Sequence, residues 1–169
     1  RAVVEARWGR RAWRRTVPGD GRSVGEAFLA PTRIYVKPVL ALLKRFRVGG
    51  IVHLTGGGWT ENIPRVLPRG CAAAVDLGSW PVPPLFSLLE REGRIERAEL
   101  LRTLNLGIGL ILIGRPADAE GIERALRRLE GAGRREFERD AGEVLGGLGH
   151  AEAAHAHRRV VDDDAVATD

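Results

Sequence analysis

A run of three glycines, Gly56 to Gly58, constrains the fold of this chain more than any other feature of its sequence. It follows a short apolar run, Ile51 to Leu54, whose composition is typical of a strand. The segment after it, Thr60 to Val66, is able to begin a short helix. Glycine adopts backbone angles closed to other residues and lets other groups approach the main chain. The run therefore predicts a tight turn between a strand and a helix.

This turn has two interpretations. Successive N–H groups in such a loop form a concave site for an anion, and the N–H groups at a helix start add to the same field. The nearby Arg65 supplies a guanidinium, which suits the geometry of phosphate. Glycine runs also occur in flexible turns without any ligand, and this one is neither a Walker A loop nor a dinucleotide fingerprint. A phosphate-binding turn is our hypothesis, and a flexible turn is the alternative.

Length and composition indicate one globular domain. The chain has 169 residues, of which 44% are hydrophobic, and this suffices for a core of its own. No apolar run is long enough to span a bilayer, so we expect no membrane partner. The single cysteine, Cys71, excludes an intrachain disulfide and fits a reducing compartment, from which we expect a cytoplasmic protein.

The net charge of +5 is concentrated near the N-terminus, where arginines alternate with Trp8 and Trp13. Such a cluster contacts nucleic acid in some proteins, and in others it is the solvated face of an amphipathic helix, here over residues 1–15. Because no nucleic-acid-binding motif accompanies it, we favour the helix face and expect no nucleic-acid partner. The chain begins with Arg1 and contains no methionine, which leads us to expect a fragment of a longer protein.

Periodicity and turn residues predict helices and strands that mix along the chain. We expect strands at 51–54, 71–75 (buried), 106–113 (central) and, more weakly, 135–138, 143–145 and 160–161. Helices are expected at 1–15, 23–29, 34–46, 85–91, 97–104 and 117–129, with glycines ending them at Gly49, Gly50, Gly93 and Gly131. This order predicts the α/β (α+β) class, a mixed β-sheet with helices packed on it.

The residues from His53 to Arg65 resemble a motif of the aminoimidazole ribonucleotide synthetase family, the phosphoribosylformylglycinamidine cyclo-ligases: H-x-T-G-G-G-x-x-E-N-x-P-R. Three further stretches agree with this family in order and spacing, namely 29–37, 76–80 and 102–109. The resemblance implies a C-terminal domain at 21–149, with a mixed sheet like that of the family. Residues 1–20 would then be a basic helix continuing from a missing N-terminal half, and residues 150–169 a mobile tail.

The resemblance also implies a function. The chain would be the substrate-side domain of an ATP-dependent ligase that converts formylglycinamidine ribonucleotide to aminoimidazole ribonucleotide in purine biosynthesis. ATP and Mg²⁺ would be held mainly by the N-terminal ATP-binding half. The intact enzyme would be a homodimer. This chain alone would not convert the substrate. The alternatives are a domain of a related ATP-dependent enzyme, such as thiamine-phosphate kinase or selenophosphate synthetase, and a non-catalytic basic binding module.

Backbone N–H groups and nearby side chains of the turn are the candidate phosphate or substrate ligands: Thr55, Gly56, Gly57, Gly58, Asn62 and Arg65. The bound phosphate would belong to the substrate or to ATP. Arg65 would neutralise it, or instead pair with Glu61 one helical turn away. Asn62 would cap the loop or reach polar groups of the substrate. Glu61 favours a structural role, because a carboxylate beside phosphate is unfavourable without a cation.

Two further residues are candidate catalytic groups. His53 would act as a general acid or base or as a phosphate donor, and the alternative is a core histidine within a strand. Asn105, close to Gly107, would lie where backbone and ligand approach, and the alternative is tight strand packing. Arg33 and Lys37 lie near the start of the helix expected at 34–46, where the helix dipole disfavours positive charge, and this indicates an anion or partner contact. The histidine-rich tract at 150–157 is only a loose metal pattern, and we expect no metal there.

Overall fold

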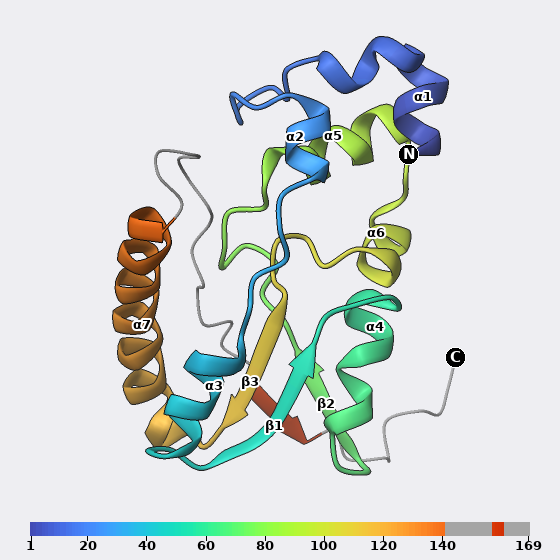
Figure 1. Cartoon of the computed structure of the whole chain (residues 1–169). Coiled ribbons are helices and arrows are strands. Elements are labelled where there is room, and N and C mark those ends of the chain that lie inside the picture. Colours follow the sequence, from blue (N-terminus) through green and yellow to red (C-terminus); the bar gives the residue numbers. More distant parts are fainter. Residues whose placement is uncertain (141–156, 161–169) are drawn as a thin grey trace, which may run out of the picture.

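Helices and short strands mix along the chain in the computed structural model, which describes residues 1–140 and 157–160 (Figure 1). The α/β (α+β) class expected from the sequence is confirmed. In chain order the elements are α1 (Ala2–Trp8), η1 (Arg10–Arg14), α2 (Val24–Phe28), α3 (Val36–Leu43), β1 (Val48–His53), α4 (Gly58–Asn62), η2 (Pro64–Val66), β2 (Cys71–Ala74), α5 (Pro84–Gly93), α6 (Arg97–Thr103), β3 (Leu110–Gly114), η3 (Pro116–Asp118), α7 (Ala119–Asp140) and β4 (His157–Val160).

The described strands pair in two antiparallel ladders, where we expected one mixed sheet. β1 pairs with β3, with His53 opposite Leu110. β2 pairs with β4, and its residues alternate between half-buried and exposed instead of being fully buried. The central strand expected at 106–113 begins only at Leu110, because Leu106 (φ 50°) and Gly107 (φ 98°) adopt left-handed angles that an extended strand excludes.

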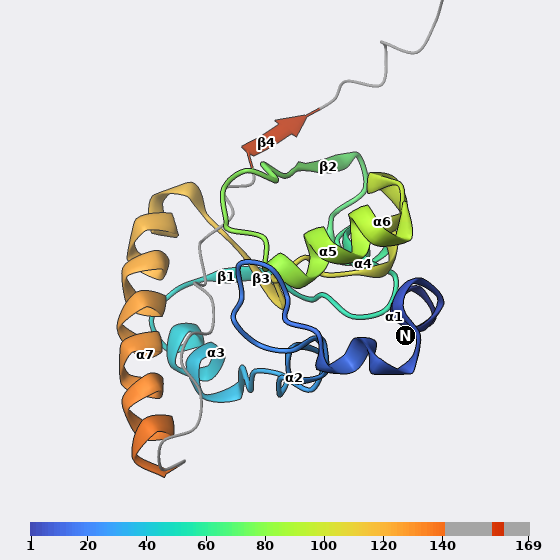
Figure 2. The same ribbon diagram turned by 90° about the horizontal axis from the view of Figure 1, so that it is seen from above.

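Helices cover the β1–β3 ladder on both sides (Figure 2). α3 and α7 pack on one side through a small cluster that includes Leu42, Ile122 and Ala125. The main cluster lies on the other side and joins the ladder to α4, α6 and the loop before β3: Val52, Leu54, Trp59, Ile63, Trp80, Leu100, Leu106 and Ile108. This main core places the glycine turn against α6, which shapes the candidate site.

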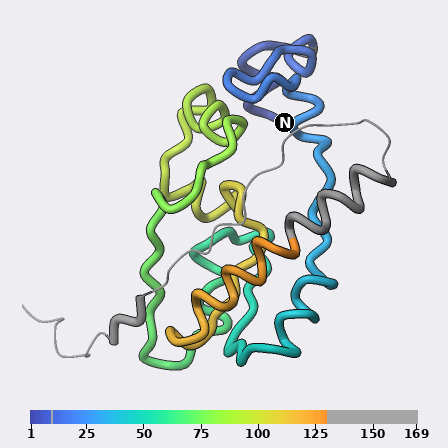
Figure 3. The backbone as a smooth tube through the Cα atoms, turned by 90° about the vertical axis from the view of Figure 1, so that its left-hand side faces the viewer, coloured from blue at the N-terminus to red at the C-terminus, as the bar shows by residue number. Residues whose placement is uncertain are grey.

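The N-terminal segment packs with α2 and α5 at one end of the molecule (Figure 3). The single helix expected over residues 1–15 is wrong: α1 ends at Trp8, and Gly9, at φ 67°, turns the chain into η1. Both tryptophans of this segment pack against a cluster shared with α2 and α5: Val4, Ala12, Val17, Val24, Ala27, Leu85, Leu88 and Leu89. The helix at 23–29 is confirmed as α2, and Ser23 and Glu26 form the capping box that its sequence spacing predicts.

Several expected element ends are also corrected. α7 continues through Gly131 to Asp140, so the strand expected at 135–138 is wrong. An interior glycine costs a helix only about 1 kcal/mol, and i,i+4 pairs such as Glu120–Arg124 support α7 from its start. Gly49 and Gly50 lie inside β1 and do not end a helix. The expected strand at 143–145 and the tail at 150–169, apart from β4, lie outside the described residues.

Candidate functional site

The glycine turn runs from the end of β1 into α4, and its third glycine is required by packing. Gly58 is buried at φ 53°, and a Cβ there would collide with the main-chain carbonyl of Leu101 and lie 2.8 Å from the carbonyl carbon of Arg102. Gly57 is also left-handed, at φ 92°. Gly56 is exposed, and a Cβ on it would meet nothing within 4 Å. Fold requirements therefore explain Gly57 and Gly58, whereas Gly56 is left without a packing reason.

Asn62 holds the turn from inside. Its side chain is 5% exposed, and its Nδ2 lies 3.4, 3.2 and 2.7 Å from the carbonyl oxygens of Thr55, Gly56 and Gly58. Its Oδ1 accepts a hydrogen bond from Nη1 of Arg65 at 3.1 Å. Both ends of the amide are thus engaged within the turn, which favours a supporting role for Asn62 over direct contact with a ligand.

The same contacts set the direction of the main-chain N–H groups. A peptide unit is planar, and its C=O and the following N–H point in opposite directions. Because the carbonyls of Thr55, Gly56 and Gly58 turn toward Asn62, the N–H groups of Gly56, Gly57 and Trp59 turn away from it. The N–H of Gly58 is engaged by the Thr55 carbonyl at 3.0 Å. Gly56, which is exposed, and its neighbour Gly57 thus present N–H groups on the side away from Asn62, and backbone amides of this kind bind anions in concave turns.

Two charged side chains flank the turn, and both are exposed. Arg65 places Nη2 at 3.8 Å from Oε2 of Glu61, so the pair expected one helical turn apart is present but long. Glu61 folds back over the loop, with its Oε2 2.5 Å from where a Cβ on Gly57 would lie. A carboxylate there opposes an anion unless a cation balances it, and Arg65 is placed to do so.

Two stacked tryptophans connect the turn to the loop that carries Asn105. The rings of Trp59 and Trp80 lie 5.0 Å apart at 16°, and both are buried. Their indole N–H groups donate to the carbonyls of Asn105 and Leu106, at 3.2 and 3.0 Å. The Asn105 side chain accepts the N–H of Gly107 at 3.1 Å. The structure thereby brings the Asn105 loop against the turn, although Oδ1 of Asn105 already serves that loop.

An aromatic pair borders the turn at the end of β1. His53 is exposed, so the alternative of a core histidine is wrong, because the β1 pleat turns His53 away from the main cluster while Val52 points into it. Its ring lies 6.0 Å from that of Tyr35 in an edge-on arrangement. The Tyr35 hydroxyl packs directly over Gly109, where a Cβ would overlap it. Burial raises the pKa of this phenol, and the charge of Arg33 acts in the opposite direction.

The fold therefore brings some, but not all, of the predicted site residues to the surface around the turn. His53, Thr55, Gly56 and Arg65 are exposed around the turn, Gly58 and Asn62 are buried beneath it, and Asn105 lies behind the stacked tryptophans. Sequence reasoning missed Tyr35 and Trp59 as members of this region. Tyr35 lies in the 29–37 stretch and Trp59 in the 53–65 motif, so both were within the family resemblance. No sequence pattern indicates which groups these two aromatic rings face.

Two other properties of the described residues bear on function. No three His, Cys, Asp or Glu side chains in this part of the chain gather as a metal site. Among its helices, none is long and apolar enough to cross a membrane.

Comparisons with known proteins show which proteins this chain is similar to. A family model described as AIR synthase related protein, C-terminal domain, matches residues 5–135. A phosphoribosylformylglycinamidine cyclo-ligase of Geobacter sulfurreducens is 52% identical over 121 residues, which cover 72% of this chain and 34% of that protein. The protein of the same name from Desulfitobacterium hafniense is 50% identical over 115 residues, 68% of this chain and 34% of its own length. The chain thus spans about a third of the length of these curated relatives.

Proposed function

The chain belongs to the family of AIR synthase related proteins, as their C-terminal domain, and we propose that it forms the substrate-side wall of a phosphoribosylformylglycinamidine cyclo-ligase. The reaction would close the imidazole ring of aminoimidazole ribonucleotide from formylglycinamidine ribonucleotide. The relatives described above are named phosphoribosylformylglycinamidine cyclo-ligases, which supports this assignment. The single observation that carries it is the glycine turn, whose N–H groups are directed outward by Asn62 beside His53 and Arg65.

The turn would anchor a phosphate, and we propose that it is the phosphate of the ribonucleotide. The amides of Gly56 and Gly57 would donate to its oxygens, and hydrogen bonds to charged groups contribute about 1.5–3 kcal/mol each. Thr55, which is exposed beside them, would add its hydroxyl. Arg65 would neutralise the phosphate while it keeps its long contact with Glu61, so that its guanidinium balances both anionic groups. Asn62 would keep the turn in this shape in the absence of ligand.

His53 is the group that we propose for proton transfer or for hydrogen bonding to the activated substrate. It is exposed at the end of β1, immediately before the turn, so a substrate anchored by its phosphate would extend within reach of the ring. Tyr35 packs against its edge and restricts its orientation. Asn105 would act through the position of its loop, which the two indole N–H groups hold.

ATP with Mg²⁺ would supply the phosphoryl group that activates the formyl oxygen before ring closure. We propose that both are held mainly by an N-terminal ATP-binding half, since the match covers only about a third of the relatives. The resemblance further leads us to propose a homodimer for the assembled enzyme. The free thiol of Cys71 fits a cytoplasmic setting.

A chimera tests the proposed function. This chain would replace the matching segment of the Geobacter sulfurreducens relative, and formation of aminoimidazole ribonucleotide would be assayed with formylglycinamidine ribonucleotide and ATP. We expect turnover, and we expect Gly56→Ala to reduce it at least about tenfold by blocking the anion's approach to the turn. Gly49→Ala adds the same methyl group at an exposed position of β1, and it should leave turnover near that of the parent chimera. A folded chimera without turnover would count against the cyclo-ligase and favour another enzyme of the superfamily.

A further inference from the structure

Helix α3 exposes a continuous apolar stripe on its outer side. Val36, Leu40 and Leu43 are 61%, 55% and 44% exposed, and their spacing places them on one face of the helix. The opposite face is already used by the fold, because Leu42 is 1% exposed and packs with Ile122 of α7. α3 is therefore apolar on two sides, of which this domain covers one.

The stripe continues toward the candidate site. Ile34, 78% exposed, directly precedes Tyr35, the residue that caps α3. Tyr35 in turn contacts His53. A surface seated on the stripe would therefore border the exposed edge where His53 and the glycine turn lie.

Exposed aliphatic groups in one continuous patch indicate an interaction surface. Fully burying a side chain such as valine, leucine or isoleucine is favourable by about 1.5–3 kcal/mol. Scattered exposed leucines need no explanation, whereas a helical stripe of them beside a site does. The stripe indicates a partner that covers α3.

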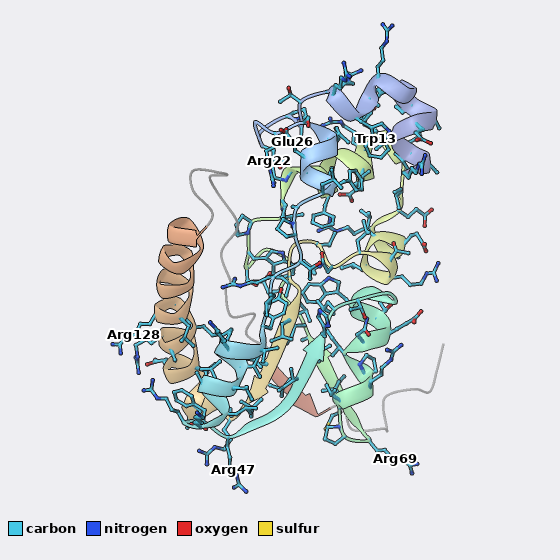
Figure 4. All side chains as sticks on the ribbon, viewed as in Figure 1. Trp13, Arg22, Glu26, Arg47, Arg69 and Arg128 are labelled. Atoms are coloured by element: carbon cyan, nitrogen blue, oxygen red, sulfur yellow. The ribbon has the colours of Figure 1, made fainter. Side chains whose placement is uncertain are left out.

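Charge narrows the choice of partner. Every charged residue between 29 and 52 is basic: Arg33, Lys37, Lys44, Arg45 and Arg47. Arg47, and Arg128 on α7, project outward near this end of the molecule (Figure 4). A two-fold interface between copies of this face would bring like charges together, which is unfavourable. The face instead fits an apolar surface bordered by acidic side chains.

We propose that the α3 stripe is the docking face for the part of the cyclo-ligase that lies outside the matched third of its length. That part would cover Val36, Leu40 and Leu43 with apolar side chains and meet the basic rim with acidic ones. The proposal rests on the proposed function only for the identity of the partner. The docked part would also face the exposed residues of the glycine turn, such as Thr55 and Gly56.

Cysteine labelling tests the docking face. Leu40→Cys is introduced with Cys71→Ser, both in this chain and in the Geobacter sulfurreducens chimera, and the rate of maleimide labelling is measured. We expect labelling to be slower by about tenfold or more in the chimera, because a docked side chain reacts only after local opening. Ala98→Cys, an exposed control on α6, should react at similar rates in both proteins.

Three outcomes would overturn the docking proposal. Equal rates for Leu40→Cys in both proteins would show that nothing docks there. Slow labelling of the chain alone would show another occupant: a second copy if the rate falls with protein concentration, or another segment of this chain if it does not. If the chimera does not assemble, Leu40→Asp in this chain gives a second test. We expect its denaturation midpoint to match that of Ala98→Asp, and a clear loss would assign the stripe to the domain's own core.

Labelling and turnover separate this proposal from the proposed function. A chimera that turns over but leaves Leu40→Cys reactive would keep the function and reject the docking face. Protection of Leu40→Cys in a chimera without turnover would keep the docking face and reject the function.

Discussion

Trp59 and Trp80 stack 5.0 Å apart, and their indole N–H groups donate to the consecutive carbonyls of Asn105 and Leu106. One ring belongs to the helix that follows the glycine turn, and the other to the loop between β2 and α5. The loop before β3 is therefore held by two donors from separate parts of the chain. This contact joins the candidate ligand turn to Asn105.

Removing one of these donors should destabilise the domain. Trp80→Phe keeps an aromatic ring in the stack but leaves the Leu106 carbonyl without its donor, which we expect to cost about 1–3 kcal/mol. Urea denaturation measures this loss. Trp13→Phe makes the same change in ring size at a half-buried position where the described residues show no indole hydrogen bond, and it should cost less. Equal losses in the two variants would assign the effect to packing alone.

The glycines of the turn should differ sharply in their tolerance of alanine. Gly58→Ala places a methyl group against the main chain of Leu101 at a left-handed φ, and we expect a loss of about 3 kcal/mol or more. Gly56→Ala adds a methyl group in open space and should change stability by less than about 1 kcal/mol. Chemical denaturation of both variants decides this. A Gly58→Ala protein as stable as Gly56→Ala would contradict the packing of the turn on α6.

Asn62 should act through the shape of the turn. Asn62→Ala removes the donor shared by the carbonyls of Thr55, Gly56 and Gly58, and we expect a loss of about 2–3 kcal/mol together with weaker binding of ribose 5-phosphate. Calorimetric titration, run where the variant is still folded, measures the binding. Asn105→Ala, which loses a single bond to Gly107, should cost less stability. Unchanged binding by a folded Asn62→Ala protein would disprove the positioning role.

Stability should fall in acid partly through Asp20. The hydrogen bond from Arg22 lowers the pKa of this carboxyl below its usual range, burial opposes this shift, and the charge of Arg22 adds to it. Because the folded-state pKa is the lower one, the stabilisation is present above the ordinary value of about 3.9 and is lost as the pH falls through the folded pKa. The urea-denaturation midpoints of the wild-type protein and of the Asp20→Asn variant should differ most at neutral pH and should converge in acid. A difference that stays constant with pH would contradict this account.

The sequence predicted correctly those elements that depend on contacts between residues close together along the chain. The capping box of Ser23 and Glu26, and the order of strand, glycine turn and helix after Ile51, are all present. Such features depend on backbone angles and on contacts within a few residues. The prediction of a helix end at Gly131 failed, because an interior glycine is a small penalty that a long helix tolerates.

The order of a strand, a glycine turn and a short helix, and the residues that border them, can be predicted from the sequence. The direction in which each group faces depends on packing between distant segments: Asn62 faces inward onto the turn, His53 faces outward beside Tyr35, and Asn105 lies behind two tryptophans. These two kinds of information differ in the range of the interactions that set them. Backbone preference acts between neighbours, whereas the Trp59–Asn105 bond joins residues 46 positions apart, and only the packing of the main core brings them together.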